Sequence, residues 1–337
     1  MTEQIFHNPD IYRIDVPLPN NPLKNLNCYV IKTPQRNLII DTGFNMPECL
    51  QAMREGLSEL QVDLNRTDLF LTHLHSDHTG LAAILMPPSS IIYMSRIDYA
   101  FFTSSLTGSF WKERDTAFTE EGFPVESLRN LQHTNPARSY APAGMFPAKT
   151  FDDGFEFQLG KYLFRCILTP GHTPGHACLY LPEQELMFLG DHVLFDITPN
   201  ITSWPRRDDS LADYIRSLHK IQKIPMKTAL PAHRGNGNVN VYDRIDQIIA
   251  HHKRRLQNTL DIVKEHPGEN AYEIGSHMTW KMRGKNWEDF PIQQKWFAVG
   301  ETIAHLDYLR NRGLIRKEII DGKTHYYANS QEIQECF

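Results

Sequence analysis

The sequence predicts an α+β protein in which two β-sheets pack face to face with helices outside, followed by a small C-terminal domain. Strand-like stretches fall into two runs, one within residues 11–72 and one within 155–189, and helical spacing follows each run. After Asn240 the strand pattern gives way to a long helix. At 337 residues with 41% apolar residues, the chain is long enough for one large domain and one small one.

The first seventy residues are predicted to form short strands joined by turns. Residues 11–17 alternate between apolar and polar, while 27–32 and 37–41 have the pattern of a buried hairpin. Helical spacing follows over 46–60, and 68–72 is a further strand.

A long interruption then separates two groups of core strands. Residues 91–94 have strand character, but about 97–150 is irregular and rich in aromatic residues. A connection of this length exceeds what core strands need. We therefore expect a helical insertion, which either covers a site as a lid, packs on the protein body, or forms an interface between two copies of the chain.

Strand patterns return after the insertion and lead into a second helical region. They are followed by a helix over 211–221 and a strand over 228–230. The expected strands are residues 155–159, 162–169, 177–181 and 186–189.

The C-terminal third predicts a separate small domain. Residues 1–240 are taken as the main domain, 241–268 as one long linking helix and 269–337 as the second domain. Helices are expected over 271–280 and 297–312, followed by two strand-like runs around Asp321-Gly322, a strong hairpin signal. Helices followed by such a hairpin favour a winged helix.

Charge and cysteine content limit the expected cellular location of the protein and the classes of molecule that it binds. The net charge of −5 gives no overall attraction to nucleic acid or anionic membrane, so small-molecule substrates fit better. The five cysteines include no C-x-x-C pair, and neither a signal peptide nor an apolar run of about 18 residues is present. A cytoplasmic protein without membrane contact is the expectation.

The stretch THLHSDHTG, residues 72–80, contains a cluster of side chains that can bind a metal ion. It places His73, His75, Asp77 and His78 directly after an apolar strand, in the pattern H-x-H-x-D-H. Imidazole and carboxylate groups suit zinc, iron and manganese, and a strand-to-helix turn lets alternate side chains converge. The pattern indicates a metal site that needs more distant partners.

Three later motifs supply such partners. His172 in TPGHTPGH, Asp191 in GDH and His233 in PAHRG each follow a predicted strand and stand beside Gly or Pro residues that turn the chain. Strand ends are where sheet-based folds commonly present side chains for chemistry.

Together these motifs resemble the metallo-β-lactamase superfamily, in the hydrolase branch that includes glyoxalase II and the lactonases. The resemblance covers about residues 10–240, with the motifs in the right order. It implies an αββα four-layer sandwich and two divalent ions, zinc or alternatively iron or manganese. It implies that one ion is bound by His73, His75 and His172 and the other by Asp77, His78 and His233, with Asp191 bridging both.

Such a centre implies hydrolysis of an ester, thioester or lactone of a small molecule by a hydroxide shared between the ions. Two ions about 3.5 to 4 Å apart can lower the pKa of a shared water toward neutrality. Asp77 is the expected catalytic residue, because a ligand carboxylate can orient the hydroxide and pass a proton to the leaving group. His176 and Asp41 either orient the ligands or make structural hydrogen bonds, and His192, next to Asp191, is expected to point away.

Other uses of the fold are disfavoured by the residues present. The predicted ligand set contains no cysteine, whereas the second metal site of the antibiotic-hydrolysing kind contains one. A β-lactamase function is therefore the less favoured use of the fold. His75 stands where the flavodiiron branch carries a carboxylate, and no flavodoxin-like domain follows.

The C-terminal domain resembles the winged helix attached to β-lactamase-like hydrolases and endoribonucleases, which leaves two alternatives open. One is a metal-dependent ribonuclease or phosphodiesterase that holds nucleic acid with the winged helix, and the other is a metal-domain sensor with a DNA-binding winged helix. Acidic and basic residues nearly balance in residues 251–337, although Arg310, Arg312, Arg316, Lys317 and Lys323 could form a small basic face. We favour an accessory role or a contact between two copies of the chain.

Overall fold

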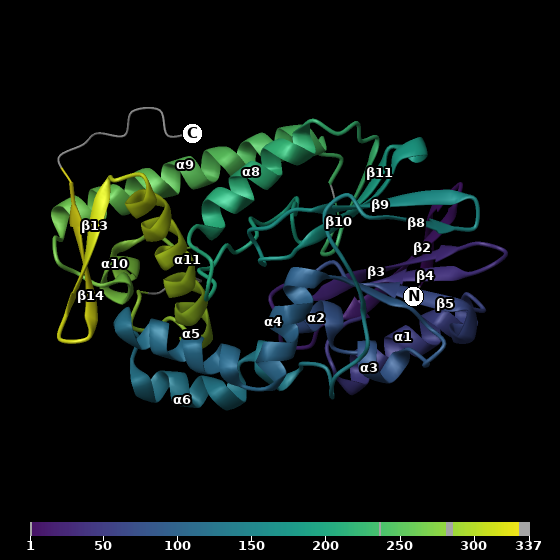
Figure 1. Cartoon of the computed structure of the whole chain (residues 1–337), viewed down its shortest axis with the longest axis horizontal. Coiled ribbons are helices and arrows are strands. Elements are labelled where there is room, and N and C mark those ends of the chain that lie inside the picture. Colours follow the sequence, from purple (N-terminus) through teal and green to yellow (C-terminus); the bar gives the residue numbers. More distant parts are fainter. Residues whose placement is uncertain (1, 236, 281–285, 330–337) are drawn as a thin grey trace.

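Two β-sheets packed face to face and covered by helices on both outer faces form one end of the molecule (Figure 1). The computed structural model describes residues 2–235, 237–280 and 286–329. The predicted α+β fold with four layers, helix, sheet, sheet and helix, is confirmed.

The first sheet contains seven strands among the described residues, in the order of the chain. Its first four strands are antiparallel neighbours, and the pairs from the fourth to the seventh are parallel. The strands are β1 (Thr2–His7), β2 (Asp10–Pro17), β3 (Asn25–Lys32), β4 (Asn37–Ile40), β5 (Thr67–Phe70), β6 (Ile92–Ser95) and β7 (Lys149–Phe151).

The second sheet has five strands within the described chain, in the order β12-β11-β10-β9-β8. Only its β11–β12 pair is parallel. The strands are β8 (Glu156–Leu159), β9 (Tyr162–Leu168), β10 (Ala177–Leu181), β11 (Leu186–Gly190) and β12 (Thr228–Pro231).

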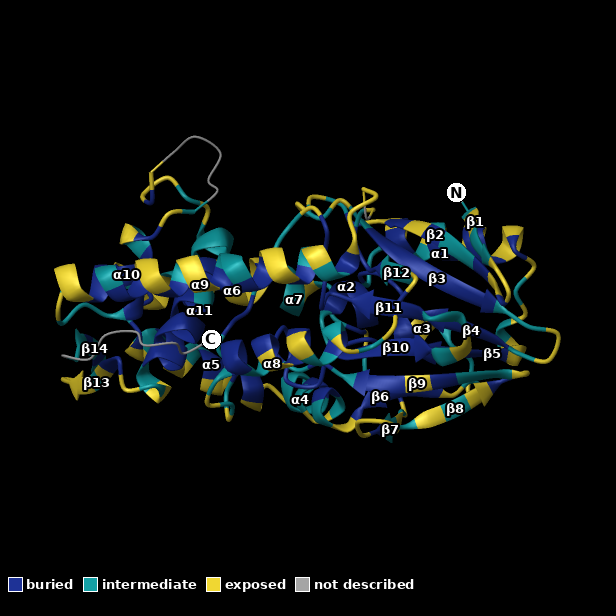
Figure 2. Ribbon diagram, turned by 90° about the horizontal axis from the view of Figure 1, so that it is seen from above, coloured by how far each residue is buried: buried dark blue, intermediate teal, exposed yellow. Residues whose placement is uncertain are grey.

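Apolar side chains from the facing surfaces of the two sheets form the central core. Phe70 of β5 stacks on Phe151 of β7 with ring centroids 5.5 Å apart, and Tyr29 of β3 reaches across to Phe188 of β11 at 5.2 Å. Figure 2 shows the central strands buried over most of their length. Burial on both faces explains why these strands are short, continuous apolar runs.

Helices cover the two outer faces. On the first sheet, α1 (Pro47–Glu59) and α3 (Ala82–Leu85) pack against the strands. A short 3₁₀ turn, Leu64–Arg66, precedes β5, and another, Pro182–Gln184, connects β10 and β11 of the second sheet. On the second sheet, α8 (Ser210–Gln222) and α9 (Val241–Glu265) do the same, with Leu211, Leu218 and Ile245 fully buried in the same cluster as Met187 and Leu189.

The insertion is helical, as the sequence predicts. It contains α4 (Arg96–Leu106), α5 (Ser109–Glu120), α6 (Val125–Thr134) and α7 (Pro136–Ser139). In both views α5 and α6 lie beside the C-terminal elements, and Phe118 of α5 stacks on Trp296 at 5.4 Å (Figures 1 and 2). The insertion therefore packs on the C-terminal part of the chain.

The C-terminal elements are α10 (Ala271–His277), α11 (Ile292–Asn311), β13 (Ile315–Ile320) and β14 (Lys323–Ala328). The last two form the hairpin expected around Asp321-Gly322, and both turn residues have the positive φ angles, 49° and 73°, that such a tight turn requires. Helix α11 begins before the expected Phe297. Residues 281–285, between the two expected helices, lie outside the described residues. The winged-helix assignment and the domain boundaries stay predictions.

Two strands of the first sheet were not expected from the sequence. The edge strand β1 has three exposed and three half-buried residues and no clear apolar alternation, and β7 is only three residues long. Both are held by pairing with a neighbouring strand, which a local pattern does not reveal. Among the described helices none is long and apolar enough to cross a membrane.

Candidate metal centre

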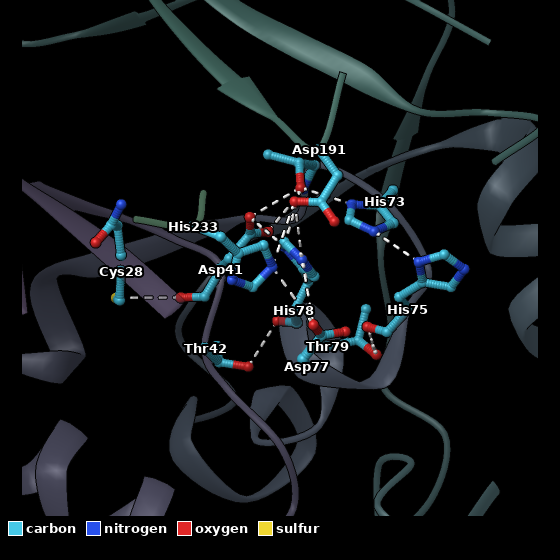
Figure 3. A network of polar contacts seen from close by, with 12 residues as sticks. Cys28, Asp41, Thr42, His73, His75, Asp77, His78, Thr79, Asp191 and His233 are labelled. Atoms are coloured by element: carbon cyan, nitrogen blue, oxygen red, sulfur yellow. Dashed lines mark hydrogen bonds and ion pairs between the residues drawn. The ribbon is translucent and has the colours of Figure 1, made fainter. Parts of the chain in front are cut away.

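The predicted ligand residues lie at one edge of the two sheets, where several strands end. Figure 3 labels six of them, all except His172. The turn after β5 and the short helix α2 (Ser76–Thr79) carry His73, His75, Asp77 and His78. The remaining three come from loops of the second sheet: His172 between β9 and β10, Asp191 after β11 and His233 after β12.

The turn that carries four of these residues is folded tightly against the first sheet. The amide of Thr42 donates to the carbonyl of His78 at 2.9 Å. At Gly80, a β-carbon would lie 2.4 Å from the backbone nitrogen of Asn45 and 2.6 Å from the carbonyl oxygen of Gly43. Only glycine allows this approach, which fixes where α2 ends relative to the loop after β4.

Three imidazoles form the first group of converging atoms. The Nδ1 atom of His75 lies 3.0 Å from Nε2 of His73 and 3.0 Å from Nε2 of His172. Nitrogen ligands of a tetrahedral zinc ion, each at about 2.0–2.1 Å, stand about 3.3 Å apart. The spacing of the three nitrogen atoms therefore fits a single divalent ion.

Asp77, His78 and His233 form a second group beside the first. The Oδ2 atom of Asp77 lies 3.5 Å from Nε2 of His233 and 3.8 Å from Nε2 of His78. Asp191 faces both groups: Oδ1 lies 3.3 Å from Nε2 of His233, and Oδ2 lies 3.5 Å from Nε2 of His172. All seven predicted ligand residues are thus brought together.

Several buried polar atoms at this place have no hydrogen-bond partner among the described residues. They are Nε2 of His78, Nε2 of His233 and Oδ1 of Asp191. Buried polar atoms are almost always hydrogen-bonded, so three such atoms that face one another without a hydrogen bond indicate a missing partner. Two nitrogen acceptors and a carboxylate oxygen together fit a divalent cation.

The two groups differ in their electrostatics. Burial, and then the neighbouring imidazoles, keep the pKa values of His73 and His75 well below 6.5, so both rings are neutral and able to bind a metal. Burial also lowers the pKa of His78, but three carboxylates outweigh it and raise the pKa to about 10. These carboxylates, Asp41, Asp77 and Asp191, would attract a metal cation in the same way as they attract the proton.

A match to a known protein family identifies the family of the chain that carries this site. A family model described as the metallo-beta-lactamase superfamily matches residues 22–233, which include every predicted ligand. The chain belongs to the metallo-β-lactamase superfamily. The resemblance to this superfamily seen in the sequence is confirmed.

Relatives within the superfamily are distant in sequence. A Beta-lactamase-like protein 2 homolog from Caenorhabditis elegans is 24% identical over 275 residues, covering 81% of this chain and 74% of the relative. An atrochrysone carboxyl ACP thioesterase from Emericella nidulans is 26% identical over 253 residues, covering 75% of this chain. The match spans 64% of that thioesterase, slightly less than two thirds of its length.

One solved structure is similar over nearly the whole chain. A metallo-beta-lactamase family protein from Thermus thermophilus has a TM-score of 0.75 at 26% identity, covering 95% of this chain and 98% of the other. The likeness therefore extends beyond the matched superfamily region into the C-terminal elements.

Hydrogen bonds from outside the two groups orient the rings of this metallo-β-lactamase superfamily site. Nδ1 of His78 donates to Asp41 at 2.8 Å, Nδ1 of His172 to the carbonyl of Asn200 at 2.8 Å, and Nδ1 of His233 to the carbonyl of Asn25 at 2.7 Å. Each bond fixes the ring and leaves Nε2 free to accept a metal.

Asp41 and His176, for which the sequence left two roles open, both contact the site. The carboxylate of Asp41 accepts from the amide and hydroxyl of Thr72 as well as from His78. His176 lies beneath Asp191 and accepts its backbone N–H at 3.1 Å, while Nδ1 donates to Thr169 at 2.7 Å.

His192, which was expected to point away, is buried elsewhere. Its ring meets that of Tyr214 edge-on with centroids 5.3 Å apart. It belongs to none of the groups whose atoms converge as metal ligands among the described residues.

Asp98 is a buried residue of the site that the sequence did not reveal. Its carboxylate accepts from the amide of Leu74 at 2.9 Å, the hydroxyl of Thr173 at 2.6 Å and the amide of Gly175 at 2.6 Å. Burial raises its pKa to about 7, although these three hydrogen bonds favour the carboxylate. Asp98 thus ties the turn carrying His73 and His75 to the loop carrying His172.

Trp204 covers one side of the first group. Its ring lies 6.0 Å from that of His75, and its Nε1 donates to the carbonyl of His172 at 3.2 Å. Phe101 and Phe110 of the insertion contact the same indole, each at 5.7 Å. The insertion therefore contributes an aromatic wall next to the site as well as packing on the C-terminal elements.

Proposed function

We propose that the chain is a metal-dependent hydrolase whose two-ion centre cleaves an ester, thioester or lactone of a small molecule. The observation that carries this proposal is the convergence of two sets of ligand atoms on Asp191, with three buried polar atoms that lack a hydrogen-bond partner in the described chain. Membership of the superfamily supports hydrolysis as the reaction class.

Each ion would have its own set of side chains. His73, His75 and His172 would hold one, and Asp77, His78 and His233 would hold the other. Asp191 would contact both, because its two carboxylate oxygens face different groups. All donors are nitrogen or oxygen, which suits zinc and equally admits iron or manganese.

The side chains of the site would then bind the ions, orient the attacking water and move a proton. When bound, the ions supply a water that ionises near neutral pH and an electrophile for the substrate's carbonyl oxygen. The Asp77 carboxylate is held ionised, because His78 and His233 outweigh the effect of burial and keep its pKa well below the usual range. This carboxylate can accept a hydrogen bond from the attacking water, and it can take up a proton from that water and pass it to the leaving group.

Thioesters are the first substrates to test. The Emericella nidulans relative is named an atrochrysone carboxyl ACP thioesterase, and the match covers 75% of this chain. The aromatic wall of Phe101, Phe110 and Trp204 next to His75 suits an apolar acyl group.

Burial of α11 argues against the two alternatives in which the C-terminal elements read nucleic acid. From Ala298 to Leu309 nearly all side chains of this helix are buried, and only Phe297 among its apolar residues is prominently exposed. A recognition helix must present its side chains to a groove. Helix α11 would have to leave its packing to do so.

A substrate panel tests the proposed function. Metal-free protein would be reloaded with zinc, manganese or iron and assayed on acyl thioesters, aryl esters, lactones, a phosphodiester and single-stranded RNA. We expect hydrolysis of at least one carbonyl substrate, lost on chelation and regained on metal addition. Cleavage of RNA alone, weakened by charge reversal at Arg312 and Arg316, would contradict the proposal and favour the nuclease.

A further inference from the structure

The segment that follows Asp191 holds one of the proposed metal ligands at two points. The carbonyl oxygen of Asn200 accepts from Nδ1 of His172 at 2.8 Å, and Nε1 of Trp204 donates to the carbonyl of the same histidine. Both the ring and the backbone of His172 thus depend on where residues 200–204 lie.

Helix α11 holds this same segment from the other side. The side-chain amide of Asn200 donates to Oε2 of Glu301 at 3.0 Å, and the amide of Ser203 donates to the carbonyl of Gly300 at 3.1 Å. A β-carbon at Gly300 would lie 2.3 Å from the hydroxyl oxygen of Thr202. The segment and the helix are therefore in direct backbone contact.

Glu301 is itself held by a third element. Arg255 of α9 forms an ion pair with Oε1 of Glu301 at 2.7 Å, which leaves Oε2 for Asn200. The guanidinium of Arg255 also lies 3.9 Å from the ring centre of Trp280 and donates to the carbonyl of Thr279. The side chain of Glu301 is only 14% exposed, so water screens this pair weakly.

These contacts form a continuous path from the C-terminal helices to the metal centre. It runs from Arg255 to Glu301, then to the side chain of Asn200, and from the carbonyl of Asn200 to His172. Outer hydrogen-bond partners of a metal-binding histidine orient its ring and raise its affinity for the ion. Here the outer partner is fixed by a residue 101 positions farther along the chain.

We propose that Glu301 is a positioning residue for His172, so that α9 and α11 complete the metal centre instead of forming an independent module. This inference rests on the proposed function, because it takes His172 as a metal ligand. It gives the C-terminal elements a role in hydrolysis: they set the orientation of a ligand through Asn200.

Variants along the path test the inference through metal affinity as well as through activity. Asn200→Ala and Glu301→Ala both remove the link, whereas Glu301→Gln keeps an oxygen that can accept from Asn200. Ser203→Ala is the matched control, since it removes another side-chain contact between this segment and α11, to Asp307 at 3.4 Å, without touching the path. Each purified full-length variant would be titrated with zinc against a competing chelator, and with cobalt while its visible absorption is recorded.

We expect Asn200→Ala and Glu301→Ala to weaken the binding of one ion by about 10-fold or more, to alter the cobalt spectrum and to lower kcat more than they raise KM. Glu301→Gln and Ser203→Ala should bind both ions within about 2-fold of the parent, well inside that effect. Parent-like metal affinity and spectra in Asn200→Ala would overturn the inference alone. A parent protein that binds no divalent ion would overturn the proposed function and this inference with it.

Discussion

Replacing Asp77 with Asn is expected to lower kcat by about 10²–10⁴-fold, the contribution of a well-placed proton-transfer group. Asparagine has nearly the same shape but no charge, so it can neither accept the proton nor neutralise the cation between His78 and His233. The effect should fall on kcat, because Asp77 acts on the attacking water and the leaving group and not on the rest of the substrate.

The chain should still fold after this change. The side chain of Asp77 is 12% exposed, and its contacts within the described part of the chain are with His78 and His233 of the site. Thermal unfolding and metal content would be measured beside the steady-state rates on the best substrate of the panel. A variant that keeps parent-like kcat would remove Asp77 from the catalytic role, whatever its metal content.

Replacing Asp41 with Ala is expected to destabilise the protein by about 3–5 kcal/mol, the usual cost of removing one partner of a buried ion pair. The carboxylate is 2% exposed and accepts three hydrogen bonds, from the amide and hydroxyl of Thr72 and from Nδ1 of His78. Without it these donors are buried and unpaired, and the His78 ring is free to turn. The variant should therefore also bind one metal ion fewer.

Asp68→Ala is the matched control. Asp68 is 5% exposed and accepts from Arg36 and the amide of Ile91. It lies near the start of strand β5, whereas the predicted ligands follow the end of this strand. It should lose comparable stability in urea unfolding and keep full metal content. Equal metal content in both variants would show that Asp41 serves only the fold.

Metal ligands could be predicted from the sequence where several ligand-type side chains lie within a short stretch. The turn from His73 to His78 could be recognised because four ligand-type residues occur within six positions, directly after an apolar strand. His172, Asp191 and His233 could be added because each follows a strand and a turn residue. Their meeting at one edge of the sheets follows from the topology.

Residues that act through long-range contacts could not be found in this way. Asp98 appears in the sequence as an ordinary helix-start residue, and nothing local indicates that it accepts from both ligand loops. Asn200 and Glu301 meet only because α11 packs against the segment after Asp191. Such pairs depend on tertiary packing, which a periodic pattern in one segment does not encode.

The C-terminal elements show the same contrast. Asp321-Gly322 predicted the hairpin, because only a few residue types accept two successive positive φ angles. The start of α11 was missed, because its first turn, from Ile292, is polar and only partly buried. That α11 is buried on nearly every side follows from its neighbours α8, α9 and α10 and the insertion.

Anomalous X-ray diffraction from crystals of the zinc-reloaded protein would show directly whether two ions are bound. We expect two anomalous peaks in each chain, one among His73, His75 and His172 and the other among Asp77, His78 and His233, with Asp191 in contact with both. A single peak in a fully active protein, or no peak at these residues, would contradict a two-ion centre.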